Sequence, residues 1–474
     1  MPAKKEILIL VLAGVAAGLF LTFYAAGLFV FLFFLCCLLL IKIFIKTGSR
    51  DFLIKLFIIS FILRALFCVI NYNVGLRQPF QGGDTQPDAA VYSGNAFYIS
   101  HLLKGDTAED RSAMAENPFL TKRIEIEGFF YKNKLPPVDE YQFGRYIFLL
   151  GTFYAWLGYA PVAAKMINSL FCCMSIVIVY LIARQLFKEE RPSRYAAAIF
   201  AFFPSIFYWS ITGLRDTVFN FFILGYLLCM VKFMTKKNYL YALFAVFFIY
   251  FSNSFRASTS IPLLAGFGAV LIINILTVIK ARGSRFLKII LVLSVCFVLG
   301  VLILHKTVII SKIVNVANLI ARANLGLSAS GRIPQSWQTN YIIYSDLVYQ
   351  QRELTAGDIF SFGYLVTIFK AIFYFFFLPF PFGNWTLNFL PFYPQIIYWY
   401  LMTPFVIKGW LLFLKKDKYT ALALLVLLLI VILPMALYES NIGTAFRHKD
   451  MFLPIAFVFA AYAFTRQQTG NGRS

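Results

Sequence analysis

Acidic side chains are scarce in this sequence, and two of them stand where they could do chemistry. Asp84 and Asp88 lie in the stretch "GGDTQPDAAVYSGNAFYISHLLKGD", just ahead of apolar residues at helical spacing. An ionised carboxylate here could accept a proton from an attacking hydroxyl group, which is the work of a general base. It could equally cap the helix, because an acidic group near a helix N-terminus is favoured by about 0.3 to 1 kcal/mol.

Cationic side chains follow in three short motifs. Arg215 and Asp216 stand in "SITGLRDTVF", Arg256 in "SNSFRAS", and Arg447 and His448 in "SNIGTAFRHKD". Guanidinium groups bind phosphate through two parallel hydrogen bonds and stabilise charge that develops on a phosphate leaving group. The candidates for binding a donor phosphate are therefore the three arginines, Arg215, Arg256 and Arg447, together with His448. Plainer interpretations stay open. Arg215 and Asp216 could form an ion pair at a tight turn, the other two arginines could reach lipid headgroups, and His448 could be an interfacial residue.

The elements that must position these groups are membrane helices. Hydrophobic residues make up 60% of the chain, aromatic residues 19% and charged residues only 14%, which is far from an average soluble domain. The formal net charge of +22 falls in short loops beside apolar runs. This is a topology signal and does not indicate a nucleic-acid-binding protein. The 7 cysteines contain no CxxC pattern, so neither a disulfide framework nor a structural zinc site is expected.

About 20 apolar residues cross a membrane as a helix, and the apolar blocks predict about twelve spans. Their predicted starts lie near residues 6, 26, 52, 161, 195, 217, 239, 258, 286, 395, 419 and 450. The run over residues 6–41 could hold two short spans or one tilted helix. We therefore expect an all-α fold, a polytopic transmembrane helix bundle, with residues 1–474 as a single integral membrane domain.

Lysine and arginine set the expected orientation. The basic connections "ARQLFKEERPSR", "KARGSR" and "KKDK" are predicted to be cytoplasmic, and so are both termini. Two long segments, 73–160 and 305–394, are then outer loops, where function is expected. The ionisable groups named above all fall on this outer face, and ionisable groups at membrane depth indicate function by default.

Both outer segments contain apolar, aromatic stretches at helical spacing. "FGRYIFLLGTFYAWLGYAP" and "FGYLVTIFKAIFYFFFLPFPFG" predict juxtamembrane helices that lie at the outer interface. A carboxylate and several cations beside a membrane suit glycosyl transfer from a lipid phosphate. The lipid tail would lie among the spans, its phosphate at the arginine-rich rim, and the sugar C1 near the aspartate.

Three stretches resemble, in order, the GT-C superfamily of polytopic glycosyltransferases, especially its protein-mannosyltransferase and aminoarabinose-transferase-like branch. They are "PDAAVYSGNAFYISHLLKG", "FLLGTFYAWLGYAPVAAKMINSLFCCMSIVIVYLIARQLF" and "FFPSIFYWSITGLRDTVFNFFI". The resemblance covers roughly residues 52–260, and "GTAFRHKDMFLPI" adds a family-like start to a late span. The chain departs from the family by its extra N-terminal spans and by the short segment after its last span.

The resemblance implies an active site and its substrates. Asp88 would be the general base because Tyr92, a substrate-binding candidate, follows at the family's spacing; Asp84 is the competing assignment, and Asp216 a secondary active-site position. The donor would be a polyprenyl-phosphate-linked sugar, attacked with inversion, and the acceptor a glycan, a lipid or a protein. Members of this branch generally need no metal cofactor. The expected location is the bacterial inner membrane, with the active site on its outer face.

Rival function classes remain. A lipid-linked glycan polymerase or ligase would also use outer-face arginine and histidine, and would depend on them more than on an aspartate. A membrane transporter would predict repeat symmetry and charges at the bilayer midplane. The sequence shows no internal repeat, and of such charges it offers only Arg64 and Lys165. A purely structural membrane protein would not be expected to gather these groups on one face.

Overall fold

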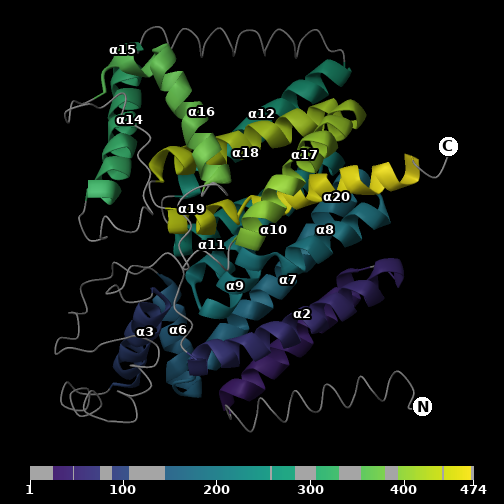
Figure 1. The fold of residues 1–474 in the computed structure, drawn as a ribbon, viewed down its shortest axis with the longest axis vertical. Coiled ribbons are helices and arrows are strands. Elements are labelled where there is room, and N and C mark those ends of the chain that lie inside the picture. Colours follow the sequence, from purple (N-terminus) through teal and green to yellow (C-terminus); the bar gives the residue numbers. More distant parts are fainter. Residues whose placement is uncertain are drawn as a thin grey trace. The chain divides into compact units, whose positions relative to one another are not determined.

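The fold is helical throughout the part of the chain that the computed structural model describes (Figure 1). The described residues are 25–45, 47–74, 88–105, 145–256, 259–282, 306–329, 354–378, 393–439 and 442–470. No strand occurs among them. The predicted all-α class is confirmed for these residues, and several of their helices are long and apolar enough to cross a membrane. The count of about twelve spans and the GT-C-like arrangement stay predictions.

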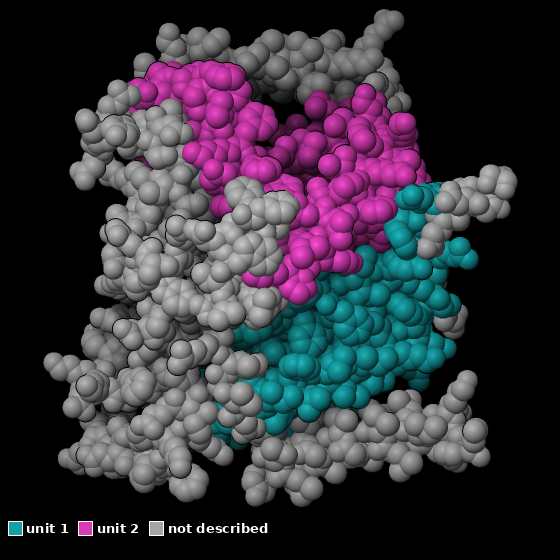
Figure 2. All heavy atoms as spheres, in the orientation of Figure 1, with its two compact units in different colours: residues 1–228, 247–258, 464–474 teal, residues 229–246, 259–463 magenta. Residues whose placement is uncertain are grey.

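The chain packs as two compact units, coloured separately in Figure 2. Unit 1 comprises residues 1–228, 247–258 and 464–474, and unit 2 comprises residues 229–246 and 259–463. The single membrane domain expected for residues 1–474 stays a prediction.

Unit 1 is built around one buried helix. Its helices are Ala25–Phe44, α2 (Thr47–Val74), α3 (Asp88–Lys104), α6 (Arg145–Leu157), α7 (Pro161–Phe187), α8 (Glu190–Phe202), α9 (Pro204–Thr212) and the first part of α10 (Arg215–Lys236). Helix α7 packs against α2, α8 and α9, while α3 packs against α6. Because α7 is apolar on all sides, it suits this central position. Pro161 starts it where a missing N–H group is tolerated.

Unit 2 is arranged around α18. Its helices are α12 (Ser260–Arg282), α14 (Lys306–Ala329), α15 (Ala356–Ile359), α16 (Phe362–Phe377), α17 (Tyr393–Lys416), α18 (Lys418–Tyr438), α19 (Ile442–Lys449) and most of α20 (Leu453–Gly470). Helix α18 packs against α12, α14, α16 and α17, and α16 also packs against α19. Helix α11 (Tyr239–Phe255) supplies residues to both units.

Within the described ranges, seven helices are long and apolar enough to cross a membrane, and a bent pair of helices could make an eighth span. The seven are Ala25–Phe44, Gly48–Tyr72, Pro161–Phe187, Arg215–Lys236, Ser260–Thr277, Tyr393–Lys416 and Lys418–Tyr438. Each begins close to a predicted span, and the bent pair Glu190–Phe202 and Pro204–Thr212 covers the span predicted near residue 195. The spans predicted near residues 239 and 450 correspond to α11, which has 17 residues, and to α20. Those predicted near residues 6 and 286 lie outside the described residues.

The bend between α8 and α9 amounts to 52° and has a local cause. Pro204 has no N–H group to continue the helix, and it disfavours helical geometry at the residue before it. Phe203 accordingly adopts an extended conformation, with φ −64° and ψ 125°. The sequence predicts one continuous span here, whereas the structure has two helices.

The juxtamembrane helices predicted in the outer segments are present as helices. Helix α3 begins at Asp88, α6 covers the first aromatic stretch, and α16 covers the second. That these helices lie at the outer interface of the membrane stays a prediction.

Candidate functional site

Four of the predicted site residues meet in unit 1, around the turn that joins α9 to α10. Helix α9 ends at Gly213, whose φ of 82° lies in the left-handed region that favours glycine. Leu214 follows, and α10 begins at Arg215. The side chains of Arg215 and Asp216 therefore start from a sharply defined position at a helix N-terminus.

Two buried side chains bind the backbone of this turn. The Tyr146 hydroxyl donates to the Gly213 carbonyl oxygen at 2.9 Å, and Asn168 Nδ2 donates to the Leu214 carbonyl oxygen, also at 2.9 Å. Asn168 Nδ2 is also 2.9 Å from the Tyr146 oxygen. Burial raises the pKa of Tyr146 above its ordinary value, so the phenol stays protonated and remains a donor. The turn is thus fixed from both α6 and α7.

Asp216 forms a largely buried ion pair with Arg256. Arg256 Nη2 donates to Asp216 Oδ1 at 2.7 Å, and the two side chains are only 14% and 3% exposed, respectively. Asp216 lies in the first turn of α10, and Arg256 directly follows the end of α11. An anion at a helix N-terminus and a cation at a helix C-terminus are both favoured by the helix dipoles. The geometry therefore stabilises both charges.

Arg215 takes a different direction from its neighbour. Its guanidinium carbon lies 5.8 Å from the centre of the Tyr92 ring, and that ring meets Tyr146 edge-on at 5.7 Å. The ion pair between Arg215 and Asp216 that the sequence left open is absent among the described residues. Consecutive helix positions point about 100° apart, so they do not face each other. The carboxylate binds Arg256, 40 positions along the chain, instead.

Tyr92 links the site to the start of α3. It is buried and lies one helical turn after Asp88, so the two positions share a face of the helix. One turn of helix rises about 5.4 Å. The structure describes Asp88 by its backbone only, and Asp84 lies outside the described residues. For the predicted general base, Asp88, the structure therefore gives the place of its backbone, at the first residue of α3 and one turn before Tyr92.

Arg64, to which the sequence assigned no functional role, makes several buried contacts. It is fully buried in α2, where its Nη2 donates to the Ala201 carbonyl oxygen at 2.8 Å and its Nε donates to Ser210 Oγ at 2.9 Å. Its guanidinium carbon also lies 4.7 Å from the centre of the Phe207 ring. Ala201 belongs to the last turn of α8, whose final carbonyls lack helical partners because of Pro204. Arg64 thus joins the end of α8 to α9, the helix that leads into the site.

The remaining two predicted residues lie in unit 2, on α19. His448 Nδ1 lies next to the Glu439 carboxylate, which makes an ion pair when the imidazole is protonated, and Thr444 donates to the same carboxylate. Glu439 caps the end of α18 and is 1% exposed, while Arg447 is half-buried. Sequence reasoning missed Glu439. The available signal was an acidic residue at the end of a long apolar run, in a chain with only 21 acidic residues.

Lys449 adds a second buried charge to this unit. Its Nζ lies 3.4 Å from the centre of the Phe446 ring and 3.4 Å from the Leu378 carbonyl oxygen. Burial lowers the pKa of this ammonium group from 10.5 to about 7, against the opposing effect of neighbouring Asp450. Asp450 is buried as well. Unit 2 therefore concentrates ionisable groups on α19 and just after it.

No group of three or more His, Cys, Asp or Glu side chains that could bind a metal ion occurs within the described ranges. Comparison of the chain with protein-family models, with curated proteins and with solved structures gives no match.

Proposed function

We propose that the protein is a membrane glycosyltransferase that moves a sugar from a polyprenyl-phosphate-linked donor to an acceptor hydroxyl group. The observation that carries the proposal is the convergence of Tyr92, Arg215, Asp216 and Arg256 on one turn in unit 1. These residues come from α3, from α10 and from the end of α11. A carboxylate and two guanidinium groups beside an aromatic ring are suitable partners for a phosphate and a sugar.

The two arginines are the groups proposed to bind the donor phosphate. Arg256 already faces an anionic oxygen, because its Nη2 donates to Asp216, and its guanidinium group has the planar geometry that suits phosphate. Arg215 Nε is buried and has no hydrogen-bond partner in the described part of the chain. A buried donor of this kind costs free energy until an acceptor reaches it. Asp216, already bound to Arg256, fits a positioning role better than that of a general base.

Asp88 is the proposed general base because it lies one helical turn before Tyr92. In the proposed step the acceptor oxygen attacks C1 of the sugar, and its proton passes to the carboxylate. The bond between C1 and the phosphate oxygen breaks, and the electron pair leaves with the lipid phosphate. The arginines stabilise the negative charge on this leaving group.

The alternative is a lipid-linked glycan polymerase or ligase, and Glu439 favours it. A buried carboxylate next to Nδ1 of His448 can stabilise the protonated imidazole ring, as in acid–base pairs of many enzymes. Arg447, next to it, would then bind the lipid-linked phosphate. In this case the chemistry would reside in unit 2 and would not need Asp88.

The experiment that tests the proposal is an assay of sugar transfer and release with a panel of polyprenyl-phosphate sugars and purified full-length protein. Release from at least one donor that Arg215→Ala and Arg256→Ala both abolish would support it. Release that is insensitive to both variants but lost in His448→Ala would favour the alternative. The absence of release from every lipid-phosphate donor would contradict both.

A further inference from the structure

Helix α17 carries a groove along one face. The groove has a volume of about 470 Å³, and its described lining consists of Pro404, Ile407, Lys408, Leu411, Leu412 and Lys415. Four of these six side chains are apolar, and the two lysines are the charged members. Such a volume is within the range of sites that bind small molecules.

The stretch of α17 that lines the groove is about as long as one leaflet of a membrane is thick. Helix α17 is a candidate span, Tyr393–Lys416, and the lining residues occupy its second half. At 1.5 Å per residue, the distance from Pro404 to Lys415 is about 16 Å. Half of the hydrocarbon core is about 15 Å thick. Pro404 therefore lies near the bilayer midplane when Lys415 lies at the headgroups.

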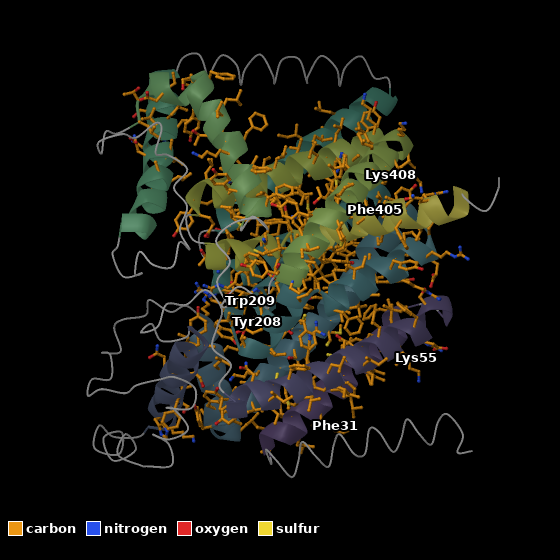
Figure 3. All side chains as sticks on the ribbon, viewed as in Figure 1. Phe31, Lys55, Tyr208, Trp209, Phe405 and Lys408 are labelled. Atoms are coloured by element: carbon orange, nitrogen blue, oxygen red, sulfur yellow. The ribbon has the colours of Figure 1, made fainter. Side chains whose placement is uncertain are left out.

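Lys408 is placed at a depth where an ammonium group is costly. It lies about 12 Å along the axis from the end of α17 and is exposed on the helix surface (Figure 3). The described residues offer it no hydrogen bond or carboxylate partner. Helical side chains tilt toward the N-terminus, which for Lys408 is the direction of the midplane. The Lys408 side chain is therefore directed away from the nearer headgroups. An anion bound to its ammonium group would offset the free-energy cost of a charge at this depth.

Lys415 lies two turns further along the same face, about 10 Å from Lys408 along the axis. An anionic group placed between them can be contacted from both sides. The apolar lining continues from these cations toward the midplane. Leu411 and Leu412 lie between the two lysines, and Ile407 and Pro404 lie beyond Lys408, so cations and apolar side chains alternate along this face of α17.

We propose that this groove binds one anionic phospholipid of the membrane. Its phosphate lies between Lys408 and Lys415, and one acyl chain lies against Ile407, Leu411 and Pro404. A zwitterionic phospholipid brings its own cation toward the lysines, so it binds less well. The proposal depends on α17 alone and does not rest on the proposed glycosyl transfer.

The basic end of α17 favours a phospholipid over the polyprenyl-phosphate donor. Lys415, Lys416 and Lys418 mark this end as cytoplasmic by the positive-inside rule. The proposed transfer uses the opposite face of the membrane. The cytoplasmic leaflet is also the one whose anionic lipids attract basic segments beside a span.

The test is native mass spectrometry of the purified full-length protein during titration with lipid. Dioleoyl phosphatidylglycerol should bind at least several-fold more tightly than dioleoyl phosphatidylcholine. Lys408→Gln and Lys415→Gln should each weaken phosphatidylglycerol binding roughly fivefold, and the double variant roughly 30-fold. Lys418→Gln removes the same charge from the first residue of α18, close to the end of α17 in the chain but outside the groove, and it should leave the affinity unchanged. Leu411→Trp, which fills the groove, should weaken both lipids.

Several results would overturn the proposal. Equal binding of the two lipids, or an equal loss in Lys418→Gln, would mean that only general membrane electrostatics acts here. Displacement of the lipid by millimolar inorganic phosphate would assign the lysines to a free anion. Displacement by equimolar polyprenyl phosphate would assign the groove to that lipid. The lipid-free variants should unfold at the same temperature as the parent protein, because both lysines are exposed.

Discussion

The ion pair between Asp216 and Arg256 allows a structural role of the arginine to be separated from a role in donor binding. Arg256→Gln leaves a carboxylate that is 3% exposed without its cation. The pair contains one charge-assisted hydrogen bond of 2.7 Å, and such bonds contribute about 1.5 to 3 kcal/mol. Because Arg256 is partly exposed, we expect the free energy of unfolding to fall by about that amount and not by the larger figure for fully buried pairs.

The double variant Asp216→Asn with Arg256→Gln supplies the control. Two amide side chains can hydrogen-bond to each other without charge, so at least half of the lost stability should return in a reversible unfolding titration in detergent. Neither amide can replace a guanidinium group on a phosphate. Donor affinity should therefore stay roughly 10- to 150-fold weaker in both the single and the double variant. Recovery of donor affinity in parallel with stability would refute the phosphate-binding role and leave Arg256 a purely structural residue.

Three further predictions concern the elements that surround the candidate residues. Gly409→Ala should lower the free energy of unfolding by about 1 to 3 kcal/mol, because a Cβ atom there would lie 1.9 Å from the Phe459 carbonyl oxygen. Arg64→Gln should lower it by a similar amount, because the Ala201 carbonyl loses a charged donor; Arg64→Lys should restore only part of this in the same unfolding titration. The unfolded chain binds the Lys449 proton up to about pH 10.5 and the folded chain only up to about pH 7, so stability should rise with pH between these values. Lys449→Met should flatten that rise.

Local signals in the sequence predicted the helices well. The carboxylate of Asp88 and the proline before it indicate a helix start, and α3 begins there. Apolar blocks of about 20 residues predicted the long helices, because length and hydropathy are properties of a segment by itself. The break at Pro204 carried an equally local signal, since a proline inside an apolar run ends or kinks a helix. The break was not predicted, because the residues on both sides of Pro204 are apolar and read as one continuous span.

The partners of the charged residues could not be predicted in the same way. Arg256 and Asp216 are 40 positions apart, and Arg64 and Ser210 are 146 positions apart. Their pairing depends on which helix faces meet, and one sequence carries no record of that. The sequence could show only that these side chains are expensive to bury and therefore need partners. Glu439 was missed for the same reason, because its importance follows from His448 and not from its neighbours in the chain.

The measurement that tests the proposed transfer most directly is the turnover of Asp88→Asn with a polyprenyl-phosphate sugar donor. Asparagine is about as good a helix cap as aspartate but cannot accept the proton. We predict that turnover falls by about 100- to 10,000-fold while donor affinity and stability stay near those of the parent protein. Asp84→Asn is the matched control four residues earlier, and it should retain activity. Full turnover in Asp88→Asn would contradict the assignment: with a dead Asp84→Asn the base would be Asp84, and with both variants active this loop would not carry the chemistry.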